Sequence, residues 1–320
     1  MSRGRALAGA AVAVLAVAAA VARHDRPPVT PGRWIGAAGL EARHETVNGR
    51  RLRLVRAGRG SPVVLVHGFA SSAYTWKDVI PTLARTHDVV ALDLPGFGGS
   101  DQPPDLSFED LPAAVTGVMD RLSLDRAVLV GNSLGGAAAA VVAGERPERV
   151  SALVLVDAAG FNLAPSDRPW VLRALASPPG GLIMALPLKR LVVERSLRQV
   201  FHDDALVTEE RVAEYLGPLL RPGALASVVS LARSPRRDPA PFAATLARVR
   251  APTLVLWGRE DAWIPLAHAE LFAAAIPGAE TVVLDECGHV PQEEKAAEVA
   301  RVVGDFVRRA ARDPAARAGE

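Results

Sequence analysis

A serine, a histidine and an aspartate in this 320-residue chain each follow a short apolar run, and such a trio activates a hydroxyl as a nucleophile. Ser133 lies in Gly131-Asn132-Ser133-Leu134-Gly135, between an apolar run and an alanine-rich stretch. A serine on a tight strand-to-helix turn exposes its hydroxyl, and flanking glycines let the neighbouring backbone pass without clashes. The sequence therefore predicts Ser133 as a nucleophile, on a turn formed by Gly131, Asn132 and Gly135.

A serine hydroxyl needs a base, and His289 is the candidate because it follows the last apolar run and titrates near neutral pH. The imidazole in turn needs an acid that holds it in one tautomer. Asp261 lies a few residues beyond another apolar run, in a loop long enough to reach the histidine. Asp157, which directly follows a run, is the alternative acid, and Glu260 is a weaker one.

Backbone N–H groups that would bind an oxyanion are expected on two loops. Leu134 follows the nucleophile and supplies one, and Phe69 in His67-Gly68-Phe69-Ala70 supplies the other. His67 is expected to shape that loop and not to act as the base. Cys287, the single cysteine, is expected to be a small buried residue and not a nucleophile. The seven histidines have no metal-ligand spacing, so neither a metal nor a cofactor is implied.

Short apolar runs must position these residues. Asn48-Gly49, between the first two runs, is a strong hairpin signal. The later runs are rich in Val and Leu with little polar alternation, which is typical of strands buried on both faces of a mostly parallel sheet. The predicted strands are Leu40–Val47, Arg51–Val55, Pro62–Val66, Val89–Leu94, Ala127–Val130, Ala152–Val156, Thr253–Leu256 and Thr281–Leu284.

Helix-like stretches alternate with these strands, which indicates an α/β fold with helices on both faces of the sheet. The segment from Phe161 to Arg248 contains no convincing strand, but it has apolar helical stretches such as Val192 to Phe201. It is predicted to be a helical cap, inserted between two core strands and covering a pocket. The predicted core helices are Phe108–Leu122, Ala137–Gly144, Leu266–Ala275 and Glu293–Ala311.

The N-terminal segment differs from the rest. Arg3 and Arg5 precede an uncharged run over residues 6–22 that ends in small residues. This pattern predicts an export signal or a membrane anchor over residues 1–22, and so an exported or membrane-associated protein, with a cytoplasmic one as the alternative. A Pro-rich linker is predicted at 23–37. The predicted domains beyond it are a core at 38–160 and 249–312, the cap at 161–248 and a tail at 313–320.

The composition limits the classes of protein and partner. Hydrophobic residues make up 49% and charged residues 22%, which suits a globular chain with a large core. A net charge of only +2 gives no argument for a nucleic-acid partner, and one cysteine excludes a disulfide within the chain. The expected partner is a small-molecule substrate, and the sequence does not indicate an oligomeric state.

The motifs, in this order, resemble the α/β-hydrolase fold superfamily in its cap-bearing branch. The resemblance implies an eight-stranded, mostly parallel sheet, a cap after the sixth strand, and a triad of Ser133, Asp261 and His289. The loop at 67–76 also resembles that of haloalkane dehalogenases and epoxide hydrolases, but those enzymes have an aspartate in place of Ser133. The matching pieces are His67-Gly68-Phe69, the stretch from Asp93 to Ser100, the turn around Ser133, the stretch from Trp257 to Asp261, and Gly288-His289.

These residues, with the resemblance, predict a serine hydrolase that works through an acyl-enzyme. Hydrolysis of a small to medium, largely apolar carboxylic ester is the favoured activity. Hydrolysis of a carbon–carbon bond in diketone-like ring-cleavage products uses the same triad and is an alternative, as is acyl transfer. A ligand-binding receptor on the same fold is the alternative from another class, but such members usually lack a triad residue.

Overall fold

The computed structural model describes residues 32–163, 168–177, 189–234 and 239–312. These residues form an eight-stranded sheet of order β1-β2-β4-β3-β5-β6-β7-β8. Strand β2 is antiparallel to β1 and to β4, and all the other neighbouring pairs are parallel. The strands are β1 (Glu41–Val47), β2 (Arg50–Gly58), β3 (Ser61–Val66), β4 (His87–Leu92), β5 (Ala127–Asn132), β6 (Val150–Val156), β7 (Thr253–Gly258) and β8 (Glu280–Leu284).

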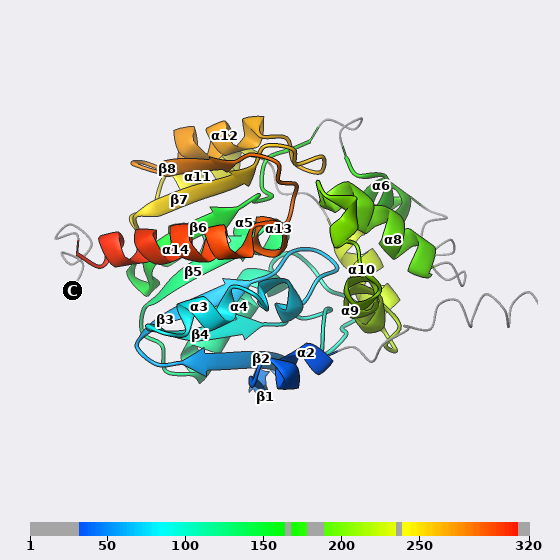
Figure 1. Cartoon of the computed structure of the whole chain (residues 1–320). Helices are drawn as coiled ribbons and strands as arrows, with labels where there is room; N and C mark the ends of the chain where they lie inside the picture. The colour runs from blue at the N-terminus through cyan, green and yellow to red at the C-terminus, as the bar shows by residue number, and fades with distance from the viewer. Residues whose placement is uncertain (1–31, 164–167, 178–188, 235–238, 313–320) are drawn as a thin grey trace, which may run out of the picture.

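Helices cover both faces of the sheet (Figure 1). One face packs against α3 (Ile80–Leu83) and α14 (Ala296–Ala310). The other face packs against the helices α4 (Asp110–Arg121), α5 (Leu134–Glu145), α11 (Pro239–Leu246) and α12 (Ala267–Ala275). The predicted α/β fold with a mostly parallel, eight-stranded sheet is therefore confirmed.

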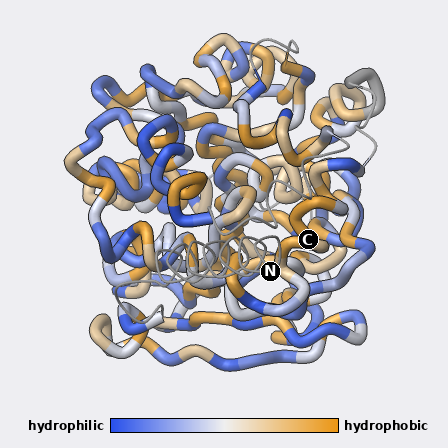
Figure 2. Tube along the Cα trace, turned by 90° about the vertical axis from the view of Figure 1, so that its right-hand side faces the viewer, coloured by the Kyte–Doolittle hydropathy of each residue, from blue (hydrophilic) through white to orange (hydrophobic). Residues whose placement is uncertain are grey.

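The central strands are apolar throughout because alternate side chains enter two different cores. In β3, Val64 and Val66 pack into the core beneath α5, whereas Val63 and Leu65 pack into the core beneath α14. Side chains on both faces are thus withdrawn from water, which is why these strands lack polar alternation. Seen from the cap side, hydrophobic and hydrophilic stretches alternate along the chain (Figure 2).

A group of helices lies between β6 and β7 in the sequence and beyond the carboxyl ends of the strands (Figure 1). Insertion of helices after the sixth strand is as predicted. However, α11 falls within the predicted cap range of 161–248 but packs on α5 and α12 with the core. The other helices of the insertion, among the residues that the structure describes, are α6 (Trp170–Ala176), α8 (Lys189–Val200), the 3-10 turn η3 (Asp204–Leu206), α9 (Glu209–Leu219) and α10 (Ala224–Arg233).

The core elements differ from their predicted bounds by a few residues, and two of these differences bear on the site. β4 ends at Leu92, so Asp93 belongs to a loop, where its carboxylate accepts hydrogen bonds from the N–H groups of Ala73 and Gly99. The predicted helix Glu293–Ala311 is two helices, α13 (Pro291–Glu294) and α14, with non-helical backbone between them at Lys295. The break lets α13 turn its glutamates toward the cap, where they accept several hydrogen bonds.

Shorter elements complete the described chain. The predicted linker at 23–37 contains α2 (Arg33–Ala37), which forms because Trp34 is buried edge-on against Tyr74, with ring centroids 6.0 Å apart. The hairpin turn at Asn48-Gly49 is as predicted, with positive φ at both residues. Two 3-10 turns, η1 (Ala73–Trp76) and η2 (Pro147–Arg149), lie in the connections before α3 and β6.

The predictions for residues 1–22, for most of the linker and for the tail at 313–320 fall outside the described residues. Among the helices that the structure describes, none has the length and apolar character needed to cross a bilayer. The export signal or anchor at the N-terminus stays a prediction from the sequence.

Candidate active site

Ser133 occupies a strained turn between β5 and α5. Its φ of 52° and ψ of −120° are rare for a residue with a side chain. A Cβ on Gly135 would lie 2.4 Å from the carbonyl oxygens of Val66 and His67, and one on Gly131 would lie 2.5 Å from the carbonyl of Gly135. Only glycine fits at these two positions, and their absent side chains allow the turn that presents Ser133 at the end of the sheet.

His289 and Asp261 come together from the loops that follow β8 and β7. The Nδ1 of His289 lies 2.7 Å from Oδ2 of Asp261, and both side chains are buried. The other oxygen of Asp261 accepts hydrogen bonds from the backbone N–H groups of Trp263 and Ile264, at 2.7 and 2.9 Å. An aspartate held in this way fixes the histidine in the tautomer with Nε2 free to accept a proton.

Hydrogen bonds hold the backbone of His289 at both its N–H and its carbonyl group. Its N–H donates to the carbonyl of Val200, at the end of cap helix α8, over 2.8 Å. Its carbonyl accepts from Nδ2 of Asn132, which also donates to the carbonyl of Val156, both at 3.1 Å. The sequence placed Asn132 only in the turn. Its link to His289 spans 157 positions and has no local sequence signal.

The two predicted oxyanion donors lie beside Ser133. The amide N–H groups of Phe69 and Leu134 have no hydrogen-bond acceptor among the described residues, and both residues line the same cavity as Ser133. A Cβ on Gly68 would lie 3.0 Å from the Cβ of Ser133, so this loop passes close to the serine. The two free amides are donors that could stabilise an oxyanion on a substrate carbonyl.

His67 shapes that loop, as the sequence predicted. It is fully buried, its Nε2 accepts from the N–H of Leu94 at 3.0 Å, and its Nδ1 donates to the carbonyl of Gly68 at 2.7 Å. Burial lowers the pKa of His67, although the carboxylate of Asp93 opposes this. With both ring nitrogens engaged in fixed hydrogen bonds, His67 is not available as a base.

The rejected alternatives lie close by. Cys287 is fully buried, and burial raises the pKa of its thiol far above the usual value, so it is no nucleophile. Glu260 accepts the N–H of Cys287 at 2.9 Å and does not hold the histidine. Asp157 forms with Asp261 and His289 a group whose ligand atoms lie within 4.8 Å of one another. That spacing suits either a cation or an acid–base cluster, and the 2.7 Å hydrogen bond between His289 and Asp261 favours the cluster.

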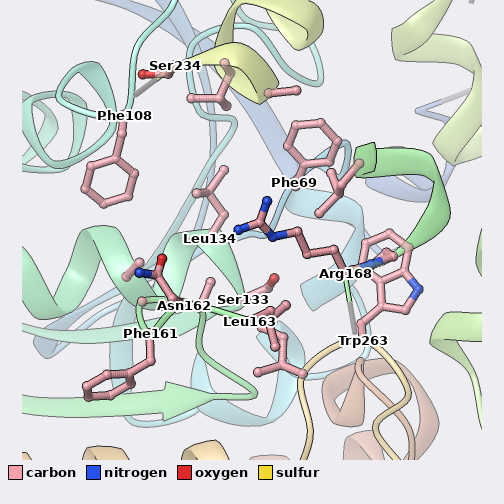
Figure 3. A pocket seen from close by; sticks show the side chains of 18 of the residues that line it. Phe69, Phe108, Ser133, Leu134, Phe161, Asn162, Leu163, Arg168, Ser234 and Trp263 are labelled. Atoms are coloured by element: carbon pink, nitrogen blue, oxygen red, sulfur yellow. The ribbon is translucent and has the colours of Figure 1, made fainter. Parts of the chain in front are cut away.

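Two cavities meet at Ser133. The larger, of about 250 Å³, lies between the core and the cap helices α6 and α10. Apolar side chains dominate its wall, but Arg168 extends across it between Phe69 and Ser133 (Figure 3). The smaller, of about 80 Å³, lies beneath α8 and α9 and is also lined by His289. Trp263 lines both cavities, and its ring lies 5.6 Å from that of His289.

The site has features that sequence analysis missed. Arg168 and Trp263 carry no motif, and they reach the cavities only because the cap and the loop after β7 fold over the same sheet end. Ser196 on α8 lines the small cavity, and its hydroxyl is buried without a hydrogen-bond partner among the described residues. The sequence indicated these residues only indirectly, through the general expectation that an apolar cap covers a pocket.

A serine on a strand-to-helix turn, near a histidine that is bonded to an aspartate, is the arrangement found in serine hydrolases built on an α/β sheet. The chain belongs to the alpha/beta hydrolase fold family, whose sequence profile matches residues 61–296.

Known proteins similar to this chain include hydrolases of several kinds. A 2-hydroxymuconate semialdehyde hydrolase from Pseudomonas sp. (strain CF600) is 34% identical over 287 residues, covering 86% of this chain and 93% of that protein. The structure of a meta-cleavage product hydrolase from Pseudomonas fluorescens matches with a TM-score of 0.71 and 28% identity, over 84% of this chain and 98% of the other. A thermophilic esterase from Thermogutta terrifontis matches with a TM-score of 0.72 and 25% identity, over 84% and 99%.

Proposed function

We propose that this chain hydrolyses a carbon–carbon bond next to the ketone of a carboxylate-bearing substrate, such as the products of aromatic ring cleavage. The observation that carries the proposal is Arg168, a guanidinium in the otherwise largely apolar cavity beside Ser133. The similarity to hydrolases named for 2-hydroxymuconate semialdehyde and related dienoates supports the same reading.

The guanidinium of Arg168 has no acidic partner among the residues that the structure describes. A cation surrounded by apolar side chains is costly unless a counter-ion reaches it, and a planar carboxylate matches the fork of an arginine. Asn162 and Ser234 line the same cavity and add hydrogen-bonding groups. This cavity therefore suits the acidic arm of a substrate.

The arrangement of the two cavities suits a ketone with two different arms. With its carbonyl carbon at Ser133 and its carbonyl oxygen at the amides of Phe69 and Leu134, a substrate would extend one arm into each cavity. The small cavity is lined almost wholly by apolar side chains such as Val193 and Leu197. It would take the apolar acyl arm, and the acidic arm would lie near Arg168.

The chemistry follows from these positions. His289 takes the proton of the Ser133 hydroxyl while the hydroxyl oxygen adds to the ketone carbon. The backbone amides of Phe69 and Leu134 stabilise the oxyanion that forms. The carbon–carbon bond then breaks, and its electron pair passes to the conjugated acidic arm. His289 returns the proton to the carbon of that arm that was bonded to the ketone carbon. Water, deprotonated by His289, cleaves the acyl ester on Ser133 and releases a second carboxylic acid.

Arg168→Leu tests the proposal with purified full-length chain. The substrates are 2-hydroxy-6-oxo-2,4-heptadienoate, which carries a carboxylate, and p-nitrophenyl butyrate, a neutral ester. A lost charge-assisted hydrogen bond is worth about 1.5–3 kcal/mol, so the variant should raise KM for the dienoate by about tenfold or more. KM for the neutral ester should change little, and Ser133→Ala should abolish hydrolysis of whichever substrate is turned over.

Arg173→Leu is the matched control, because Arg173 lies on neighbouring α6 but is exposed and does not line the cavity. It should leave both KM values unchanged. Rapid turnover of the ester with none of the dienoate would replace the proposal with ester hydrolysis. An equal effect of Arg168→Leu on both substrates would remove Arg168 as the carboxylate-binding residue.

A further inference from the structure

Asp157 is a buried acidic side chain close to the candidate triad, and only one of its two oxygens has a hydrogen bond among the residues that the structure describes. It follows β6 directly and is fully buried, with a φ of 44° that is unusual for any residue other than glycine. Its Oδ1 accepts one hydrogen bond, from the N–H of Gly258 at 3.0 Å. Its Oδ2 is buried and has no hydrogen-bond partner among the described residues. An ionised carboxylate in this position would lack the donors that a buried charge requires.

Asp261 is differently placed, although the two carboxyl groups are neighbours. It accepts three hydrogen bonds, from the N–H groups of Trp263 and Ile264 and from Nδ1 of His289. Those donors stabilise a carboxylate. Asp157 and Asp261 follow adjacent parallel strands, β6 and β7, and each has an oxygen within 4.8 Å of the other.

Two ionised carboxyl groups at this spacing repel each other, which favours a proton on the one that has fewer hydrogen-bond donors. Burial raises the pKa of Asp157 well above its ordinary value, and the adjacent Asp261 raises it further, while the N–H of Gly258 opposes both. No ion pair involving Asp157 is present in the described part of the chain. The other titratable groups that face it are His289, whose Nδ1 is hydrogen-bonded to Asp261, and Cys287 and Glu294, which carry no positive charge.

We propose that Asp157 carries a proton on Oδ2 and donates it in a hydrogen bond to Asp261, which holds that carboxylate opposite His289. Asp157 is thus a positioning residue that acts through Asp261. The inference rests on the proposed function only in assuming that Ser133, His289 and Asp261 act together. It requires no particular substrate.

Two substitutions separate this role from simple space-filling. The amide of Asp157→Asn keeps the shape and the donor, whereas Asp157→Leu keeps roughly the volume and loses the donor. The rate at which a fluorophosphonate labels Ser133 measures activation of the serine without any knowledge of the substrate. The Asn variant should label within about threefold of the wild type, and the Leu variant slower by about tenfold to a hundredfold.

Equal rates for the Leu variant and the wild type would overturn the proposal, as would an Asn variant as slow as the Leu variant. If the Leu variant does not fold, infrared spectroscopy decides. The carbonyl band of protonated carboxylic acids at pH 7 should be weaker in Asp157→Asn than in the wild type, by the contribution of one carboxyl group. An unchanged spectrum would refute the proton on Asp157. If wild-type Ser133 is not labelled, the proposed nucleophile fails, and the infrared result still decides the state of Asp157.

A second readout is the pH dependence of stability. Since the folded state keeps a proton that the unfolded chain releases above about pH 4, the wild type should lose stability relative to Asp157→Asn as the pH rises. The melting temperature of Asp157→Asn minus that of the wild type should therefore increase from pH 5 to pH 8. Asp125→Asn, at an exposed position, should show no such increase. A constant difference for Asp157→Asn would contradict the proposal.

Discussion

Asp261 is held by backbone donors on one oxygen and by His289 on the other, and this geometry makes a definite prediction. In Asp261→Asn, the amide NH2 group can face Nδ1 of His289. Nδ1 would then accept a hydrogen bond from the amide, and the ring proton would lie on Nε2. The histidine would be in the wrong tautomer to take a proton from Ser133. Turnover should fall by about ten-thousandfold, as in serine proteases, measured as kcat/KM or as the labelling rate of Ser133.

Thermal melts of the same variant serve as the control, because a folded but inactive protein is required for this conclusion. If Asp261→Asn retains a tenth or more of the wild-type rate while Asp157→Asn is inactive, the roles of the two aspartates are the reverse of those proposed here.

Residue types, read from the sequence, located the candidate serine, histidine and acid because each comes directly after a strand or a few residues beyond one. The same reasoning favoured Asp261 and kept Asp157 as the alternative, since both follow core strands. Only the fold shows that Asp261 reaches Nδ1 of His289 while Asp157 lies beside it. Arg168 and Trp263 were beyond prediction, because their roles depend on long-range packing and not on a local pattern.

The turn that carries Ser133 depends on the absence of a side chain at Gly135. A methyl group there would meet two backbone carbonyls that cannot move aside without distorting β3. Gly135→Ala should therefore destabilise the chain by about 3 kcal/mol or more, in denaturant unfolding, and greatly lower labelling of Ser133. Gly36→Ala, where nothing lies within 4 Å of the added carbon, is the control and should cost far less. Similar costs at both positions would show that the turn tolerates a side chain.

The cap helix α9 is joined to α13 by a buried ion pair between Arg211 and Glu293, with Nε and Oε2 2.8 Å apart. Their side chains are 8% and 1% exposed, so removing one partner leaves a charge that water cannot reach. Arg211→Met should cost about 3–5 kcal/mol of stability. The double variant Arg211→Met/Glu293→Gln should cost clearly less than the sum of the two single changes.

Arg309→Met removes one partner of an exposed pair, with Glu280, and provides the comparison. It should cost at most about 1 kcal/mol. Denaturant unfolding of all four variants checks this prediction. Strict additivity of the Arg211 and Glu293 changes would show that the two side chains do not stabilise each other.

Several buried carboxyl groups give the whole molecule a common pH dependence. Burial raises the pKa of Glu214 to about 7, against the opposing effect of the Gly32 N–H that donates to it at 2.7 Å. Burial also raises the pKa of Glu293 and Glu294. Since these groups bind protons in the folded state that the unfolded chain releases, each costs stability as the pH rises through the interval between its two pKa values.

For Glu214 that interval runs from about 4.3 in the unfolded chain to about 7 in the folded one. Glu214→Gln keeps an acceptor for Gly32 and cannot ionise. The variant should gain stability relative to the wild type between pH 5 and pH 8, by on the order of 1 kcal/mol after allowance for the solvent near the carboxyl. Melting temperatures at the two pH values test this. A difference that does not change with pH would show that Glu214 ionises as readily in the folded state as in the unfolded chain.

The sequence predicted the order of strands and helices well because each buried strand is marked by its own apolar run, which is a local pattern. It predicted the division of the insertion less well. Helix α11 has apolar residues, as the buried faces of the cap helices do, and nothing within it indicates that it packs on α5 and α12. The C-terminal helix was predicted as one piece because the break at Lys295 serves contacts of Glu293 and Glu294 with distant parts of the chain.

The hydrogen bond from the N–H of His289 to the carbonyl of Val200 has a consequence for engineering by recombination. Caps of related hydrolases are attractive cassettes to exchange when a new substrate range is wanted. In this chain the end of α8 holds the backbone of the candidate base, and Glu294 accepts the N–H groups of both Gly288 and His202. A chimaera that takes the whole insertion from another protein would lose these attachments. Crossover points that retain residues 200–202 together with the loop at 287–294 should preserve them.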